Sequence, residues 1–260
     1  MLLPVALTLL VLLIPLVSLR ILSLSPSRRR KPSRRITNEP TRLLVVLGSG
    51  GHTAEMFSLL HDLDTLKFTH RSYVVSSGDA FSASKAKEFE RGLYDIARSR
   101  ASAARKQEKQ ESNGSANTRT KEELYGSYDI EVVPRARKIH QSILTTPFSS
   151  TRCLLACFSI LMSTSSTSEA RLGYPDLIIS NGPATAVMII LASFILRFFG
   201  LPGTAGKMRT IYVESWARVR RLSLSGKILL RVVDRFLVQW ERLAKELGGR
   251  AEYIGVLVSH

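Results

Sequence analysis

Cysteine is nearly absent from this sequence: its 260 residues contain only two, Cys153 and Cys157. Two cysteines cannot form a disulfide framework. They also do not form a C-x-x-C motif, and no histidine cluster accompanies them, so the usual zinc motifs are excluded. We therefore expect both to be small buried side chains of a reduced protein, which suits a domain that faces the cytosol.

Acidic residues are also scarce, with 21 Asp and Glu against 37 Lys and Arg, for a formal net charge of +16. The sequence shows no carboxylate cluster, and we expect neither a metal nor another cofactor. Nucleic acid is one partner that suits so basic a chain, but helix-turn-helix, zinc-finger and aromatic RNA-binding signatures are missing. Residues 1–42 hold eight basic residues and one acidic residue. That placement favours an anionic membrane surface as the partner.

Charge is missing altogether from residues 2–19. A helix of this length reaches about 27 Å, close to the hydrocarbon thickness of a bilayer. A cleaved signal peptide is the alternative, but its basic residues normally precede the apolar stretch, whereas here the run SRRRKPSRR follows it. We expect a single-pass anchor over 1–24 and a basic linker over 25–41. The positive-inside tendency then places residues 20–260 in the cytosol.

After the linker, short apolar runs alternate with helical patterns. This order predicts an α/β domain over 42–260, with a single Rossmann-like, doubly wound parallel sheet. In such sheets ligands bind beyond the carboxyl ends of the strands. The expected strands are 43–47, 71–76, 128–133, 176–180, 209–214, 235–239 and the closing run 251–258. The expected helices are one whose apolar face carries Met56, Leu59, Leu60 and Leu63, and those at 81–97, 139–163, 184–199, 223–233 and 240–247.

Three segments are less regular. Residues 98–127 are polar and nearly free of large apolar groups, so we expect most of them to form a disordered insertion. The apolar stretch 187–196 is short for a membrane span, and its place between two strands favours a buried crossover helix. The stretch 153–162 is similar, although a partly exposed face of it would suit contact with a bilayer.

The first strand runs into a glycine loop, in the stretch LLVVLGSGGHTAEM over residues 43–56. A strand, glycine loop and helix bring backbone N–H groups to a phosphate. A dinucleotide fingerprint needs a third glycine where Thr53 stands, and Asp79 is a loose candidate for its acidic residue. A P-loop is excluded because no G-K-[ST] follows. A membrane-tethered NAD(P)-binding oxidoreductase stays an alternative. The predicted phosphate-binding residues of this loop are Gly48, Ser49, Gly50, Gly51 and Thr53.

Two further loops lead to the same expected edge of the sheet. The segment SNGPATA repeats the strand, turn and helix design, and presents Asn181, Gly182 and Pro183. His52 stands at the mouth of the glycine loop, where a histidine serves as a base, a phosphate contact or a helix cap. Glu214 ends the fifth expected strand, on the ligand side. Three loops that converge on one edge favour a binding site there.

Five motifs carry a resemblance: GSGGHTAEM, SNGPATA, YVESWARV, LSLSGKILL and FLVQWERL. They resemble the membrane-anchoring subunit of the eukaryotic two-part transferase that adds the second GlcNAc to dolichyl-diphosphate-GlcNAc in asparagine-linked glycosylation. The similarity covers 43–97, 128–258 and the anchor. That family is similar to the acceptor half of a GT-B glycosyltransferase, whose two Rossmann-like domains hold the reaction between them.

The resemblance implies an enzyme that works only as part of a complex in the endoplasmic reticulum membrane, with the nuclear envelope left open as a further location. It implies a soluble partner that holds UDP-GlcNAc, dolichyl-diphosphate-GlcNAc as the acceptor, and inverting transfer. It also implies His52 as the candidate base, with Glu214 second. A self-sufficient lipid-linked glycosyltransferase and a scaffold without a site stay open as alternatives. The chain ends on an apolar segment, 251–260, which by analogy docks the partner through Tyr253, Ile254, Val256, Leu257 and Val258.

Overall fold

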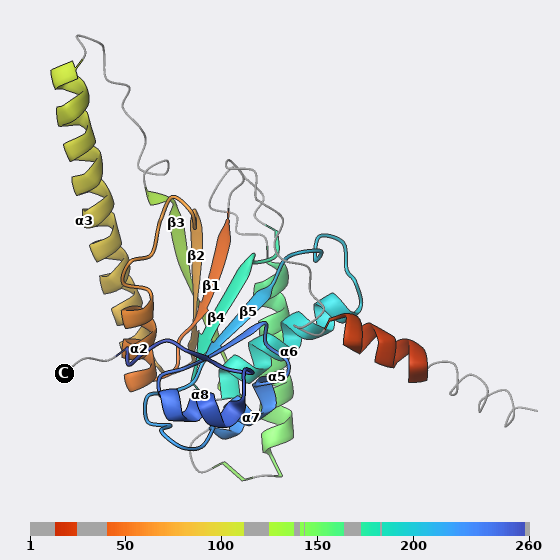
Figure 1. Ribbon diagram of the computed structural model, residues 1–260. Coiled ribbons are helices and arrows are strands. Elements are labelled where there is room, and N and C mark those ends of the chain that lie inside the picture. The colour runs from red at the N-terminus through yellow and green to blue at the C-terminus, as the bar shows by residue number, and fades with distance from the viewer. Residues whose placement is uncertain are drawn as a thin grey trace, which may run out of the picture.

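The computed structural model describes residues 14–24, 41–111, 125–137, 141–142, 144–163, 173–182 and 184–257. Seven parallel strands form one sheet in the order β3-β2-β1-β4-β5-β6-β7 (Figure 1). The predicted single Rossmann-like parallel sheet is confirmed. The strands are β1 (Arg42–Val46), β2 (His70–Ser76), β3 (Ser127–Val133), β4 (Leu177–Asn181), β5 (Arg209–Val213), β6 (Arg235–Val238) and β7 (Glu252–Tyr253).

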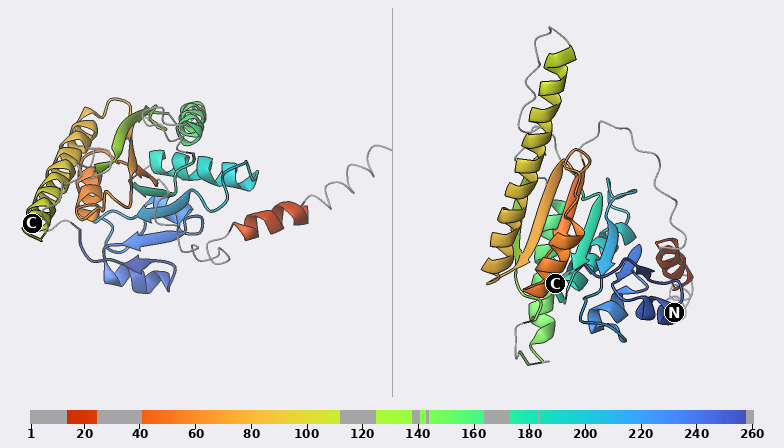
Figure 2. Two further views of the ribbon diagram at one scale, coloured as in Figure 1. Left: turned by 90° about the horizontal axis from the view of Figure 1, so that it is seen from above. Right: turned by 60° about the vertical axis from the view of Figure 1, so that its left-hand side comes forward.

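Helices cover both faces of the sheet, as the alternation of apolar residues along β1 requires. Leu43 and Val45 contribute to a core cluster with α2 and α3, whereas Leu44 and Val46 contribute to a cluster with α5 and α6. Figure 2 shows these helix layers on opposite sides of the strands. The helices are α2 (Gly51–Leu59), α3 (Ala80–Glu111), α5 (Thr146–Met162), α6 (Ala184–Phe198), α7 (Leu224–Leu229) and α8 (Glu241–Leu247).

The strand order reverses at β1, which lies between β2 and β4. The register pairs Val46 of β1 with Ser180 of β4, so the loops that follow these two strands leave the sheet side by side. In doubly wound sheets the crevice at this reversal is where ligands bind. The glycine loop after β1 and the turn after β4 are therefore the expected place of a ligand site in this fold.

Helix α3 is longer than the sequence predicted, and it corrects part of the predicted disordered insertion. Residues 98–111 continue the helix, which projects beyond the end of the sheet (Figures 1 and 2). Their polar composition argues against burial, but Ala, Arg, Lys, Gln and Glu are strong helix formers. The hydroxyls of Ser99 and Ser102 donate to the carbonyls of Asp95 and Arg98. The segment 112–124 lies outside the described residues.

The two apolar segments are helices of the domain. Helix α6 is a crossover between β4 and β5 and buries Ile189 and Ile190, as predicted. Helix α5 packs against α6 and buries both cysteines, which are free thiols, so the prediction for them is confirmed. The outer side of α5 exposes Leu155.

Near the N-terminus, residues 14–23 are helical. Arg20 donates hydrogen bonds of 2.7 and 2.8 Å to the carbonyls of Arg197 and Phe198, at the carboxyl end of α6. Among the helices of the described residues, none combines the length and the apolar character that a membrane crossing needs. The remainder of the predicted anchor, 1–13, and the predicted linker over 25–40 lie outside the described residues.

Candidate acceptor and catalytic site

The glycine loop connects β1 to α2 and is held closed by Thr53, which is fully buried. Its hydroxyl donates to the carbonyl of Gly48 and lies 2.7 Å from the hydroxyl of Ser82 in α3. Gly50 directly precedes α2 with a φ of 62°, a conformation that favours glycine. Thr53 stands where a dinucleotide fingerprint has its third glycine, and its side chain connects the glycine loop to α3.

Asp79 begins α3 beside this loop. Its carboxylate accepts from the backbone N–H of Ser82 at 3.1 Å and from its hydroxyl at 2.7 Å. Burial raises the pKa of Asp79, but these hydrogen bonds, a further one from Ser49 and the charge of Arg135 outweigh it, so the pKa lies below the usual value. Asp79 is thus an ionised helix cap that supports the glycine loop.

Two glycines bring the loops after β1 and β4 into contact around His52. A Cβ on Gly48 would lie 2.7 Å from His52 Cβ and 3.2 Å from the carbonyl oxygen of Asn181. A Cβ on Gly182, whose φ is +90°, would lie 3.1 Å from Gly48 Cα and 3.3 Å from His52 Cδ2. Both positions require glycine because the imidazole fills the space between them. The structure thus brings together Gly48, His52, Asn181 and Gly182, while Pro183 lies outside the described residues.

Two buried polar atoms in this contact have no hydrogen-bond partner among the residues that the structure describes: His52 Nδ1 and Asn181 Oδ1. Such atoms are rare in folded proteins and often mark a place where a ligand or water binds. The first turns of α2 and α6 begin at this crevice, and helix amino ends attract anions through their free N–H groups and the helix dipole. The amino ends of α2 and α6 and the two unpartnered atoms lie close together at this point of the fold.

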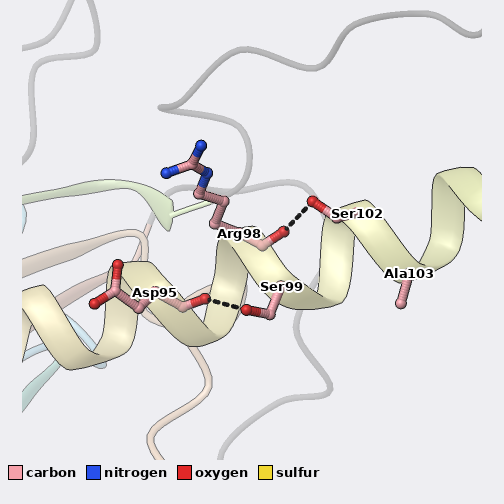
Figure 3. Close-up of a pocket in the computed structure, with 5 residues that line it drawn as sticks. All are labelled: Asp95, Arg98, Ser99, Ser102 and Ala103. Atoms are coloured by element: carbon pink, nitrogen blue, oxygen red, sulfur yellow. Dashed lines mark hydrogen bonds between the residues drawn. The ribbon is translucent and has the colours of Figure 1, made fainter.

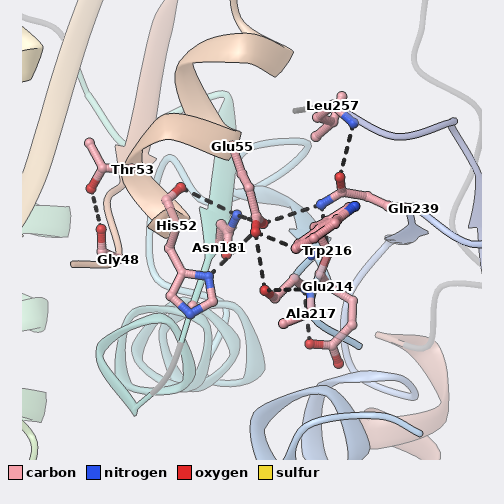
Figure 4. A network of polar contacts seen from close by, with 12 residues as sticks. Gly48, His52, Thr53, Glu55, Asn181, Glu214, Trp216, Ala217, Gln239 and Leu257 are labelled. Atoms are coloured by element: carbon pink, nitrogen blue, oxygen red, sulfur yellow. Dashed lines mark hydrogen bonds and ion pairs between the residues drawn. The ribbon is translucent and has the colours of Figure 1, made fainter. Parts of the chain in front are cut away.

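Glu55, in the second turn of α2, is the carboxylate of the site. Its Oε2 lies 4.0 Å from His52 Nδ1, and the carboxylate accepts hydrogen bonds from four neutral donors (Figure 4). These donors are Asn181 Nδ2 at 2.9 Å, Gln239 Nε2 at 3.2 Å, Ser215 Oγ at 3.1 Å and the backbone N–H of Trp216 at 3.2 Å. The predictions from sequence missed Glu55, although it is the one acidic residue of α2 and adjoins the buried Met56.

Glu214, the second predicted catalytic residue, is buried directly after β5. Its Oε2 accepts from the backbone N–H and the hydroxyl of Ser223, at 3.1 and 3.0 Å, and so holds the start of α7. A Cβ on Gly226 would lie 2.0 Å from the same oxygen. Figure 4 shows the Glu214 side chain directed away from His52. These contacts position α7, and a catalytic role for Glu214 stays a prediction.

The predicted docking segment is described up to Leu257. Ile254 and Leu257 pack against the core cluster that contains α2, and the Leu257 N–H donates to Gln239 Oε1 at 3.0 Å. Tyr253 and Val256 are 52% and 44% exposed. Val258 lies outside the described residues. The segment therefore contacts the site through Gln239 and leaves two apolar side chains at the surface.

A separate hollow runs along the exposed side of α3 (Figure 3). All five lining residues come from this one helix, and its two hydrogen bonds stay within the helix. Among the described residues, α3 alone contributes groups to this hollow, and they do not converge as the groups around His52 do. Its lining residues are Asp95, Arg98, Ser99, Ser102 and Ala103.

Comparison with known proteins matches residues 43–257 to the family described as oligosaccharide biosynthesis protein Alg14 like. The UDP-N-acetylglucosamine transferase subunit alg14 of Aspergillus fumigatus is 40% identical over 242 residues, which cover 78% of this chain and 100% of that protein. The subunits of that name from Schizosaccharomyces pombe and Homo sapiens are 38% and 33% identical. Those two alignments cover 89% and 85% of this chain, and 87% and 84% of the relatives.

Proposed function

This chain belongs to the Alg14 family, and we propose that it is the membrane-anchoring, acceptor-binding subunit of a UDP-N-acetylglucosamine transferase. The proposed reaction adds the second GlcNAc to dolichyl-diphosphate-GlcNAc. The donor UDP-GlcNAc is held by a separate soluble subunit, and this chain alone is inactive. The names of its relatives as transferase subunits support a heteromeric enzyme and leave the oxidoreductase alternative without support.

One observation carries the proposal: His52 is held between two loops at the point where the strand order reverses. The glycine loop and the turn at Asn181 suit the acceptor's diphosphate, because both precede helix amino ends. The His52 side chain is 30% exposed, although its Nδ1 is buried. A base at the mouth of a phosphate site is what transfer to a lipid-linked sugar requires.

The proposed chemical step is an inverting displacement. The acceptor hydroxyl oxygen attacks the anomeric carbon of the donor GlcNAc, and the bond from that carbon to UDP breaks. UDP leaves with the bonding electron pair, and the hydroxyl proton passes to His52. The binding of the two substrates by two subunits brings the reacting atoms together only in the complex, which accounts for an inactive single chain.

Location and assembly belong to the same proposal. Residues 1–24 anchor the chain in the endoplasmic reticulum membrane, and the basic linker 25–41 keeps the domain on its cytosolic face. Residues 251–260 recruit the soluble subunit, with Tyr253 and Val256 as the exposed apolar contacts. Apolar side chains at a surface favour such association.

The test is a transferase assay on membranes that carry the full chain, with and without the soluble subunit. Transfer is expected only when both are present. His52→Ala should lower it by about 100-fold, the scale of a lost general base. His61→Ala is the matched control, because that side chain is 79% exposed and lies outside the site. Transfer by the chain alone, or full activity of His52→Ala with the partner, contradicts the corresponding part of the proposal.

A further inference from the structure

Gln239 connects the C-terminal segment to the site. It directly follows β6 and is 1% exposed. Its Oε1 accepts from the Leu257 N–H at 3.0 Å, and its Nε2 donates to Glu55 Oε2 and to the Glu214 carbonyl, each at 3.2 Å. A carboxamide accepts on one side and donates on the other. The Leu257 N–H therefore fixes which side of the amide faces Glu55.

Glu55 in turn faces the imidazole. Its Oε2 lies 4.0 Å from His52 Nδ1, which is buried and has no hydrogen-bond partner within the described part of the chain. The other ring nitrogen points away from Glu55 (Figure 4). A carboxylate that accepts from Nδ1–H leaves the opposite nitrogen free to take a proton. In enzymes without substrate such contacts are often long and shorten when the substrate binds.

The geometry points to Glu55 and Gln239 as positioning residues that tie the orientation of His52 to the seating of residues 254–257. With that segment in place, Gln239 holds the Glu55 carboxylate, and the carboxylate orients the imidazole toward the acceptor hydroxyl. This inference rests on the proposed function, in which the same segment docks the soluble subunit. It adds that docking and catalysis are connected through two buried side chains.

A purely structural role for this network makes a different prediction. The hydrogen bonds of Glu55 connect α2 to three places: β4, the segment that follows β5, and Gln239 at the end of β6. A network of this kind can stabilise the fold without any part in catalysis. Loss of a structural contact lowers the amount of folded complex but leaves the turnover of each remaining complex unchanged. Loss of a positioning contact lowers kcat while donor binding, which belongs to the partner, stays the same.

The experiment uses the full chain produced together with the soluble subunit in membranes. Gln239→Met keeps the length of the side chain and removes all three hydrogen bonds. We expect kcat per complex to fall by about 10- to 100-fold, the scale of a misplaced catalytic group, with unchanged KM for UDP-GlcNAc and unchanged co-purification of the partner. Gln141→Met is the matched control, because the Gln141 amide donates to Ser149 in α5, outside the site. An unchanged kcat for Gln239→Met overturns the inference.

A double-mutant cycle tests the relay itself. Glu55→Gln preserves the size of the side chain and should lower kcat to a similar extent. When Glu55→Gln is already present, adding Gln239→Met should lower kcat by less than a further threefold, because Gln239 acts through Glu55. If the double variant instead loses the product of the two single-variant factors, the two residues act independently and the relay is overturned. If Gln239→Met does not accumulate, Glu55→Gln decides alone, and a normal kcat overturns the inference. Absence of transfer by the unmodified pair would instead contradict the proposed function.

Discussion

Two buried glutamates occupy contrasting environments in this molecule. Glu90 on α3 and Glu55 on α2 each accept four hydrogen bonds from side chains or backbone. Glu90 faces the guanidinium of Arg71, which is fully buried with it, whereas all four donors to Glu55 are neutral. The charge of Glu90 is therefore compensated within the core, whereas the ion-pair partner that the described residues give Glu55 is His52, whose Nδ1 lies 4.0 Å away.

Both carboxylate oxygens of Glu90 accept hydrogen bonds. Arg71 donates two hydrogen bonds of 2.8 Å to it, and Tyr73 donates one of 2.6 Å. Burial and the neighbouring carboxylate raise the pKa of Tyr73 well above its usual value, so the phenol stays a donor. Burial lowers the pKa of Arg71, but the hydrogen bond and charge of Glu90 more than offset this effect. This pair holds α3 to β2. The two glutamates therefore differ in charge compensation and not in the number of hydrogen bonds: Glu90 is paired with a buried cation, whereas Glu55 lies beside a histidine at the proposed site.

The largest expected effect is on folding. Arg71→Met leaves the Glu90 carboxylate buried without its cation, and we expect the free energy of unfolding to fall by about 3–5 kcal/mol. Denaturant unfolding of the full chain in detergent measures it. Lys85→Met is the control, because its ion pair with Glu88 lies at the surface of the same helix and should contribute no measurable stability. Equal stability of the two variants would contradict the structural role given to Glu90.

Substitution of each glutamate by glutamine separates their two roles. Glu90→Gln removes the charge that balances Arg71 and should cost about 3 kcal/mol or more. Glu55→Gln leaves four neutral donors around a neutral amide, and we expect a smaller loss of about 1 kcal/mol, the scale of one or two perturbed hydrogen bonds. Thermal unfolding of both variants in detergent checks the order. A larger loss at Glu55 than at Glu90 would show that Glu55 is the structural residue.

The sequence predicted the central strands well because each of them is a local apolar run. It predicted β7 less well, since the apolar run 251–258 contains a strand of two exposed residues, Glu252–Tyr253. It also predicted that Gly48, His52 and Asn181 lie at one edge, since Gly48 and His52 follow β1, Asn181 ends β4 and parallel strands end at the same edge; their role in binding stays a prediction. It assigned the carboxylate of the site to Glu214, whereas the structure places Glu55 beside His52, because contact between α2 and Gln239 depends on tertiary packing. The end of α3 differs from the prediction for another reason: a polar composition does not distinguish a disordered segment from an exposed helix.

A third carboxylate gives a smaller, pH-dependent effect at the opposite edge of the sheet. Asp129 accepts from His70 at 3.0 Å. Burial raises the pKa of Asp129, but the hydrogen bond and charge of His70 outweigh it, and the pKa is lowered. A carboxyl with a lowered folded pKa stabilises the fold above its unfolded pKa, near 4, and loses that contribution as the pH falls through the folded value.

Asp129→Asn should therefore lower the free energy of unfolding by about 1 kcal/mol at pH 7. The difference from the unsubstituted chain should shrink as the pH falls from about 4 toward 2, because the aspartate then becomes protonated. Unfolding curves at a series of pH values measure this. Asp62→Asn is the control, since Asp62 is 95% exposed. A difference that stays constant with pH would contradict the role given to the ionised carboxyl.

The last expected effect is local and concerns α3 beyond its anchor at Glu90. Tyr125 also donates to Glu90, so tertiary contacts hold the first turns, whereas Ala103 is exposed and its turn depends on helix propensity. Ala103→Gly should therefore cost about 1 kcal/mol of local helix stability and speed amide exchange near residue 103 about fivefold, with exchange at Glu90 unchanged. Rapid exchange at 98–103 in the unsubstituted chain would restore the predicted disorder. Equal acceleration at both places would mean that the whole helix opens as one unit, and that Glu90 does not hold its first turns independently.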